Sequence, residues 1–338
     1  MNEPLLSSKD GVALNPKTMG LKDTPELSKG IAHISSYGII RVSGEDSLSF
    51  LHNQLTQDFL NLGDKEARLC AFCNAKGRMQ ASFIGFKASQ AEVLLVCSKD
   101  LIAQTVKRLS MFILRSKVKV TDETLNYQIY GVIGRSEPIK NELQPTFAYS
   151  LPWQHSVCES DTGNQHWITL YPSIGIERYL CISPSSIDIQ VDLITESQWN
   201  LSEVMSGVCL ISHATYESFV PQMINYESLE GVNFHKGCYP GQEVVARSQF
   251  RGTIKRRGFL LTSVAPLHDG QDLFLQSDKE QPCGQIVRSA SYQGIFYGFA
   301  SLSLSATLDN ASLIRSVSEG AEHAVEVLSL PYTLREDI

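Results

Sequence analysis

The chain has 338 residues, of which 43% are hydrophobic and 19% are charged, and its formal net charge is −7. This length predicts two or three domains with a core that needs no disulfide or metal to hold it. The negative charge excludes non-specific binding of polyanions by the whole surface. The first twenty residues contain no long apolar segment, and apolar runs such as 93–97 are far too short to cross a bilayer. We therefore expect a cytoplasmic protein.

The first half of the chain alternates strand and helix patterns. Residues 1–30 are polar, and we expect them to be flexible. A strand at 37–44 precedes an amphipathic helix at 45–62, and a hairpin turns at Lys76-Gly77. A second helix is predicted at 98–115, with Ser98 as its N-cap. Irregular alternation of this kind predicts an α+β fold with mainly antiparallel, ferredoxin-like sheets.

In the second half of the chain the residue pattern changes twice. Residues 134–165 are polar and are interpreted as an excursion or linker, after which strands return at 166–171 and 178–183. A helix is predicted at 195–207, where Thr195 and Gln198 fit a capping box. From residue 254 onwards, short strands separated by Gly, Asp and Ser predict a C-terminal antiparallel β-barrel or sandwich.

The cysteines and histidines form few recognisable groupings. Eight cysteines spread over a chain of this size are interpreted as reduced thiols, most of them packed in the core. Cys70 and Cys73 form a lone C-x-x-C, but a zinc site needs a second pair. They also lie on a predicted strand, where residues three apart face opposite sides, so we interpret them as packed core residues. His235 could pair with Cys238, although a surface or capping role is typical at that spacing.

Cys238 lies in the sequence HKGCYPGQE, at 235–243. The turn signal at 239–241 leads into a short helix predicted to end at Gly252. The positive end of that helix and the neighbouring Lys236 both favour the thiolate. A buried structural cysteine usually has apolar neighbours on both sides, so this pattern favours an exposed, reactive thiol.

A run of basic residues follows, in a stretch without acidic residues between 244 and 267. Two interpretations are equally compatible with this spacing: a solvated face, or a site for a carboxylate tail, a phosphate or RNA. The basic residues are Arg247, Arg251, Lys255, Arg256 and Arg257.

Several segments resemble one known family. The sequence KGCYPGQEVVARSQFRGTIKR (236–256) is similar to the K-G-C-Y-x-G-Q-E signature and basic tail of the YgfZ family. These are bacterial folate-binding proteins related to the T-protein of the glycine cleavage system. The resemblance extends from about residue 35 to the end of the chain. Further segments match in the same order, at 41–58, 73–80, 114–120, 218–234 and 330–334.

The resemblance implies a T-protein-like body of two ferredoxin-like lobes, one of them discontinuous, at 31–253, and a six-stranded barrel at 254–338. It also implies a central site for tetrahydrofolate or another reduced folate. In that site, Tyr37 and Trp199 would stack on the flat rings, although without the resemblance both would be interpreted as core aromatics. The other residues that it assigns to folate are Gln222, Asn225, Lys236 and Arg247.

The sequence also departs from the T-proteins. Where these enzymes carry an acidic pair, this chain has Ala81 and Ser82, and Met223 stands where they carry a Glu. A transferase needs a carboxylate to orient and accept protons at the folate nitrogen. We therefore expect no aminomethyltransferase activity.

The resemblance implies a folate-binding protein that supports the assembly or repair of iron–sulfur enzymes, including those that methylthiolate tRNA. Cys238 would act as nucleophile, persulfide carrier or transient metal ligand. Expected partners are these client enzymes and, through the basic run, tRNA, with no membrane. One alternative is a folate-dependent aminomethyl- or methyltransferase, which the missing carboxylates disfavour. Another is a plain RNA-binding module, although no RRM, KH or zinc-knuckle signature is found.

Overall fold

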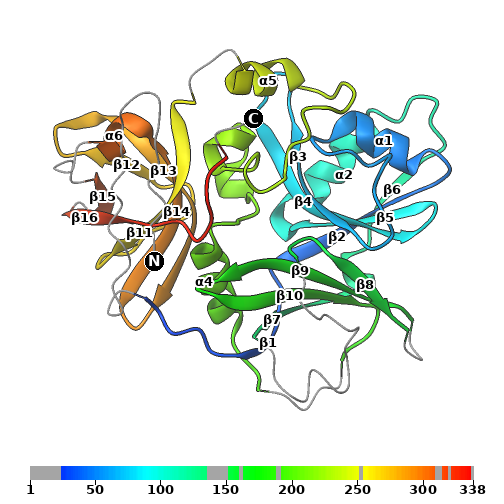
Figure 1. Ribbon diagram of the computed structural model, residues 1–338, viewed down its shortest axis with the longest axis horizontal. Coiled ribbons are helices and arrows are strands. Elements are labelled where there is room, and N and C mark those ends of the chain that lie inside the picture. Colours follow the sequence, from blue (N-terminus) through cyan, green and yellow to red (C-terminus); the bar gives the residue numbers. More distant parts are fainter. Residues whose placement is uncertain are drawn as a thin grey trace, which may run out of the picture.

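Two antiparallel sheets and a β-barrel surround a central helix (Figure 1). The structure is a computed structural model, and residues 1–23, which make up most of the predicted flexible segment, lie outside the part that it describes. The described residues are 24–134, 151–159, 163–187, 192–250, 254–308, 314–318 and 321–335.

The first sheet is buried on both faces. One face packs against helices α1 (Ser47–Gln54) and α2 (Ile102–Ser110), and the other belongs to the largest apolar core. The predicted hairpin at Lys76-Gly77 is confirmed, because the two strands on either side of it pair antiparallel. In spatial order the strands are β3 (Ala67–Cys73), β4 (Met79–Ser89), β5 (Glu92–Ser98), β2 (Tyr37–Ser43) and β6 (Lys119–Asp122).

The predicted helix at 45–62 is too long, since α1 ends at Gln54. Leu55 already has extended dihedral angles, and Thr56 exchanges hydrogen bonds with Ala71 of β3 through its amide and its hydroxyl. Phe59 remains fully buried, but on an irregular segment. Tertiary hydrogen bonds to the sheet therefore override the helical period.

The helix predicted at 98–115 is also shorter. It consists of a 3₁₀ turn, η1 (Lys99–Leu101), followed by α2, which ends at Ser110. Ser98 occupies the predicted N-cap position, at the start of η1, but its side chain makes no cap hydrogen bond. A further 3₁₀ turn, η2 (Thr124–Asn126), leads into the second sheet.

The second sheet includes part of the predicted linker. Residues 135–150 and 160–162 lie outside the described chain, but β8 (His155–Cys158) pairs with β9 and forms an edge of this sheet. That part of the linker prediction is wrong, because backbone pairing to β9 makes a strand of a polar segment. In spatial order the strands are β1 (Gly30–His33), β7 (Gln128–Ile133), β10 (Ile176–Ser183), β9 (Gln165–Ser173) and β8.

Helix α4 (Glu196–Ser206) lies between the second sheet and the barrel, in contact with both (Figure 1). Its capping box is confirmed, since Thr195 and Gln198 bond to each other's backbone amides, and Gly207 ends the helix in the left-handed conformation. Seven of its eleven residues are buried, which makes α4 the centre of the molecule. The chain then passes through η3 (His213–Thr215), η4 (Pro221–Ile224) and α5 (Gln242–Phe250).

The C-terminal strands form a closed six-stranded antiparallel barrel, as predicted. The α+β fold class is therefore confirmed, and the first barrel strand begins at Arg256. The division of the chain at residues 253 and 254 stays a prediction. The strands are, around the barrel, β11 (Arg256–Ser263), β14 (Ile295–Ser303), β13 (Asp278–Tyr292), β12 (Asp272–Leu275), β15 (Ile314–Ser318) and β16 (Ala321–Leu328), with a short helix α6 (Leu304–Leu308) after β14.

Candidate functional site

Cys238 is the exposed cysteine of the chain. All eight cysteines lie in the described part and are free thiols; six are buried and Cys158 is half-buried, as the sequence predicted for most of them. We call residues 235–241, which lead into α5, the thiol loop. On either side of Cys238, Lys236 and Tyr239 are buried. The loop therefore presents one thiol to solvent between two residues anchored in the protein.

Lys236 is an anchor of the thiol loop. Its ammonium donates hydrogen bonds to the backbone carbonyls of His52 and Leu55, the latter at 2.8 Å, and lies 4.7 Å from the centroid of the Tyr239 ring. These carbonyls are at the C-terminal end of α1, where a cation is favourable. Burial lowers the pKa of Lys236 to about 8. The Lys236 ammonium is therefore held by backbone carbonyls inside the protein and is not a surface cation.

The turn into α5 packs on the β3–β4 hairpin. Gly241 has a φ of +81°, and a Cβ there would lie 2.4 Å from the carbonyl oxygen of Asn74 and 2.8 Å from the Cα of Gly77. Only glycine allows both the left-handed backbone and this close approach. The predicted short helix after it is confirmed over Gln242–Phe250, and its expected end at Gly252 lies outside the described residues.

Tyr37 and Trp199, predicted to stack on folate, lie in the protein interior. Trp199 is 0% exposed; the Arg178 guanidinium lies 4.5 Å from its ring centroid, and the ring also packs against the backbone of Gly131. Tyr37 is 5% exposed, and its hydroxyl donates a hydrogen bond to Glu203. Both aromatic rings are therefore covered by the protein's own side chains.

These two aromatics and three charged side chains form what we call the central cluster: Tyr37, Arg178, Trp199, Glu203 and Arg288. All are buried except Arg288, which is half-buried. Arg178 approaches the Glu203 carboxylate at 3.9 Å, and burial raises the pKa of Glu203 although Arg288 and Arg178 oppose this. The cluster joins β2, β10, α4 and β13. It therefore connects the two sheets and the barrel.

The remaining predicted folate residues do not gather with these aromatics. Gln222 donates a hydrogen bond to the carbonyl of Val245, and Asn225 exchanges two hydrogen bonds with the backbone of Gly258. Both are buried and hold α5 and β11 against η4. Arg247 is exposed on α5. The structure thus gives these residues separate environments.

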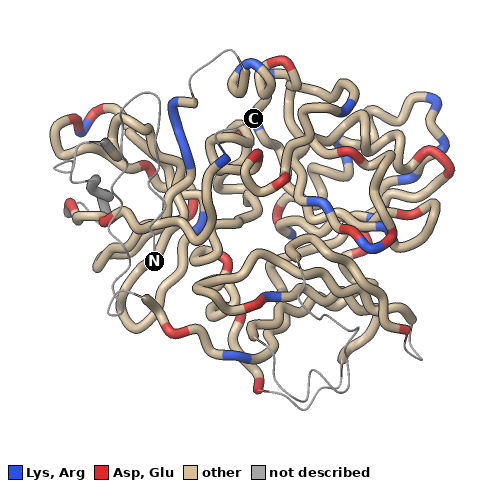
Figure 2. The backbone as a smooth tube through the Cα atoms, viewed as in Figure 1, with Lys and Arg blue, Asp and Glu red and all other residues tan. Residues whose placement is uncertain are grey.

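The described cations of the basic run lie on α5 and at the start of β11 (Figure 2), and only some of them reach solvent. Lys255 is exposed, but Arg256 donates a hydrogen bond to the carbonyl of Pro282. Arg257 is buried in an ion pair with Glu227, because successive residues of β11 face opposite sides of the barrel wall. Arg251 lies outside the described residues. Arg247 and Lys255 are therefore the described residues of the run that present a cation to solvent.

The three residues that stand in place of the T-protein carboxylates have different surroundings. Ala81 and Ser82 are fully buried on β4, and the Ser82 hydroxyl accepts a hydrogen bond from the amide of Ile211 at 2.8 Å. Met223 lines a cavity of about 260 Å³ between the η4 region and the barrel.

Cys70 and Cys73 belong to opposite faces of the first sheet, as expected. In the described part, no three His, Cys, Asp or Glu side chains could hold a metal ion together.

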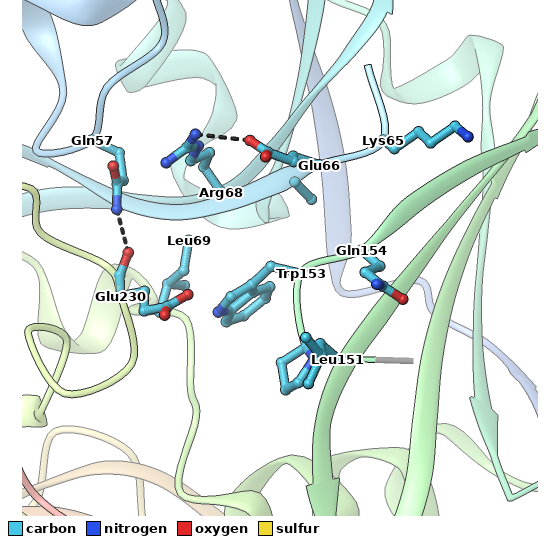
Figure 3. A pocket seen from close by; sticks show the side chains of 11 residues that line it. Gln57, Lys65, Glu66, Arg68, Leu69, Leu151, Trp153, Gln154 and Glu230 are labelled. Carbon is cyan, nitrogen blue, oxygen red and sulfur yellow. Dashed lines mark hydrogen bonds and ion pairs between the residues drawn. The ribbon is translucent and has the colours of Figure 1, made fainter. Parts of the chain in front are cut away.

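A larger cavity, of about 390 Å³, lies where the first sheet meets the second (Figure 3). Trp153 forms its wall and ties the two sheets together, since its carbonyl accepts from Ala67 of β3 and its amide donates to Thr169 of β9, both at 2.8 Å. Its indole also donates to the carbonyl of Leu229 at 3.1 Å. The lining residues are Gln57, Lys65, Glu66, Ala67, Arg68, Leu69, Leu151, Pro152, Trp153, Gln154 and Glu230.

Two lining residues of this Trp153 cavity have left-handed backbones, Trp153 with a φ of +66° and Glu230 with a φ of +59°. Such conformations cost about 1–3 kcal/mol in non-glycine residues and gather at ligand sites. Within the described chain, the carboxylate of Glu230 and the ammonium of Lys65 have no ion-pair partner, and the buried Nε of Arg68 has no acceptor. Burial and the charge of Glu230 raise the pKa of Tyr171, beside Trp153, to about 12.

The sequence did not indicate this cavity. Trp153 follows a polar stretch, and Glu230 lies in a segment noted only for its resemblance. The left-handed conformation of a tryptophan leaves no trace in sequence, and the two sheets meet only in the folded chain.

Comparison with known proteins gives the same picture over nearly the whole chain. No protein-family model matches it. The "tRNA-modifying protein YgfZ" of Yersinia enterocolitica is 25% identical over 331 residues, covering 94% of this chain and 96% of that protein. The protein of the same name from Blochmanniella pennsylvanica is 28% identical over 262 residues, covering 74% and 77%. The chain is therefore similar along most of its length to proteins of the YgfZ family.

The fold has a solved counterpart. The glycine cleavage system aminomethyltransferase T of Bartonella henselae superposes with a TM-score of 0.64 at 16% identity, over 89% of this chain and 85% of that one. The chain therefore has the expected T-protein-like body. No helix in the described residues is both long and apolar enough to span a membrane.

Proposed function

We propose that the chain is a cytoplasmic, tetrahydrofolate-binding protein that supports the assembly or repair of iron–sulfur enzymes, including enzymes that modify tRNA, with Cys238 as its reactive group. The observation that carries this proposal is the thiol loop, which presents the exposed Cys238 between two buried anchors. The name of the YgfZ relatives supports the role in tRNA modification. A contact with tRNA would use Arg247 and Lys255, the described cations that reach solvent.

The same chemistry disfavours the transferase alternative. Ala81 and Met223 offer no carboxylate, and Ser82 accepts a backbone hydrogen bond. Proton transfer at the folate nitrogen needs a positioned acid or base. A bound folate would therefore shape the site rather than pass on a one-carbon group.

The residues predicted for folate do not fit it as a group. Tyr37 and Trp199 have no open face, Lys236 is bonded to α1, and Gln222 and Asn225 are bonded to neighbouring backbone. Neither of the two cavities described above is lined by any of these residues or by Arg247.

The Trp153 cavity fits the chemistry of a reduced folate better. Its volume lies in the range of small-molecule sites. Trp153 would supply the aromatic wall for the pterin, and Glu230 would accept hydrogen bonds from its N–H groups. Lys65 and Arg68 line the same cavity, where Arg68 is ion-paired with Glu66 (Figure 3). Each could bind a carboxylate of the glutamate tail, Arg68 in exchange for Glu66.

Calorimetric titration of the full chain with several reduced folates tests the folate proposal. We expect Glu230→Gln and Arg68→Leu each to weaken binding, and Arg247→Gln, an exposed arginine far from this cavity in sequence, to leave it unchanged. If folate binding is lost in Trp199→Phe but unaffected in Glu230→Gln, the folate site lies at the central cluster instead of the Trp153 cavity. No binding of any reduced folate would refute this part of the proposal.

The thiol is tested separately in cells. In a strain that lacks the protein, Cys238→Ser should fail to restore the activity of iron–sulfur tRNA-modifying enzymes, whereas Cys158→Ser, at the half-buried thiol, should restore it. Full restoration by Cys238→Ser would show that the thiol is dispensable.

A further inference from the structure

His52 stands beside the thiol loop with a defined orientation. It is 8% exposed near the C-terminal end of α1, and its Nδ1 lies 2.9 Å from a carboxylate oxygen of Asp58. Asp58 also accepts hydrogen bonds from the amide and side chain of Asn61. Although burial acts to raise the pKa of Asp58, the hydrogen bonds from Asn61 and His52 bring it below its ordinary value. Asp58 is therefore a carboxylate and can only accept.

This fixes the tautomer of His52. Because a carboxylate has no proton to give, Nδ1 must carry the hydrogen. In the neutral imidazole, Nε2 then holds a lone pair and can accept a proton. No described residue forms a hydrogen bond with Nε2. His52 is thus a nine-tenths-buried base with a free acceptor atom, oriented by an acid.

Nε2 is directed at the thiol loop. A Cβ at position 237 would lie 3.3 Å from Nε2, so Gly237 leaves just enough room for the imidazole. Lys236 donates a hydrogen bond to the carbonyl of His52 itself. The two residues that precede Cys238 therefore both lie against His52: Lys236 at the backbone carbonyl of His52, and Gly237 at its imidazole ring.

We propose that His52, oriented by Asp58, is the base that accepts the proton of the Cys238 thiol. The S–H bond breaks and an Nε2–H bond forms, giving a thiolate and an imidazolium, and no electron is transferred. Asp58 is a positioning residue that stabilises the imidazolium. This inference rests on the proposed role of Cys238 and adds how its thiolate is formed.

Charged groups on both sides of His52 favour this proton transfer, one for each product. Asp58 faces Nδ1 and stabilises a positive ring, while Lys236, on the loop side, stabilises a negative sulfur. Cys70 of β3 and Tyr239 also lie near Lys236, and burial raises the pKa of both, so both stay protonated. No hydrogen bond joins Nε2 to the Cys238 sulfur in this structure, and such bonds are often long before a partner binds.

The sequence offers a matched control. His235 is also close to Cys238 along the chain and was the histidine that spacing suggested, but it is exposed and has no orienting acid among its described contacts. If proximity alone mattered, His235 and His52 would have equal effects. The proposal requires that only His52 matters.

The rate of alkylation of Cys238 by iodoacetamide, measured by mass spectrometry from pH 5 to 9, tests this. We expect His52→Gln to lower the rate at pH 7 by at least about tenfold, equivalent to about 1.4 kcal/mol of thiolate stabilisation. Asp58→Asn should lower it less, and His235→Gln should leave it within about twofold. Added imidazole should restore the rate in His52→Ala, which a purely structural role would not produce.

Protection of the buried Cys70 and Cys97 in the same samples reports whether each variant is folded. If folded His52→Gln reacts like the wild-type protein across the pH range, His52 is not the base, and the proposed role of Cys238 is untouched. If Cys238 of the wild-type protein is instead among the slowest cysteines to react, the proposed function itself fails.

Discussion

The thiol loop and the central cluster are both regions that the family resemblance marked for function, yet the structure treats them in opposite ways. In the loop, Cys238 is exposed while its neighbours are anchored. In the cluster, Tyr37, Trp199 and Glu203 are buried and bonded to one another or covered by arginine. The difference teaches that a residue matched by resemblance is a candidate for contact with a ligand only where the protein has left it uncovered.

The largest effect should come from the central cluster. Trp199→Ala should lower the free energy of unfolding by about 3–5 kcal/mol, because it empties a fully buried site in contact with Arg178 and Gly131. Urea unfolding followed by circular dichroism measures it, with Trp199→Phe as the milder control. A loss below about 1 kcal/mol in Trp199→Ala would mean that the ring is not part of the core, and its role as a ligand platform would then be open again.

The same region should respond to pH. Burial raises the pKa of Glu203 above 4.5 in the folded protein, so just above that pH the folded state holds a proton that the unfolded state has lost. Stability should therefore fall as pH rises from about 4.5 through the folded pKa, by at most about 1.4 kcal/mol per pH unit. The difference between wild type and Glu203→Gln isolates this slope from other titrating groups. Parallel stability curves would show that Glu203 does not titrate in this range.

An effect smaller than that of Trp199→Ala should come from the anchor of the thiol loop. Lys236→Met removes the hydrogen bonds to the carbonyls of His52 and Leu55, and we expect a loss of about 1–3 kcal/mol in unfolding free energy. Lys255→Met, at an exposed lysine, should change stability by less than about 0.5 kcal/mol. Equal effects of the two substitutions would place the Lys236 ammonium in solvent.

The smallest effect on stability should come from Cys238 itself. Cys238→Ser changes an exposed atom, and we expect a shift within about 0.5 kcal/mol. Thermal unfolding of purified Cys238→Ser checks this alongside the cellular test of its function. A loss above about 2 kcal/mol would show that the sulfur packs in the structure and would weaken its proposed role.

The sequence by itself determined the elements whose signals are local. The capping box of α4, the hairpin at Lys76-Gly77 and the barrel strands other than β15 were predicted, because each depends on residues a few positions apart. The opposite facing of Cys70 and Cys73 followed from strand period alone. The exposed Cys238 was also predicted, since glycine, proline and lysine beside a cysteine are typical of a loop.

Only the tertiary structure decided which of the remaining residues are available. The end of α1 at Gln54 depends on the hydrogen bonds of Thr56 to β3, and the burial of Arg257 depends on the barrel face to which it points. The Trp153 cavity and the approach of His52 to Gly237 bring together segments remote in sequence. Local patterns specify backbone conformation, whereas packing between distant segments decides which side chains are buried and which have hydrogen-bond or ion-pair partners. Burial and partners together distinguish a functional side chain from a structural one.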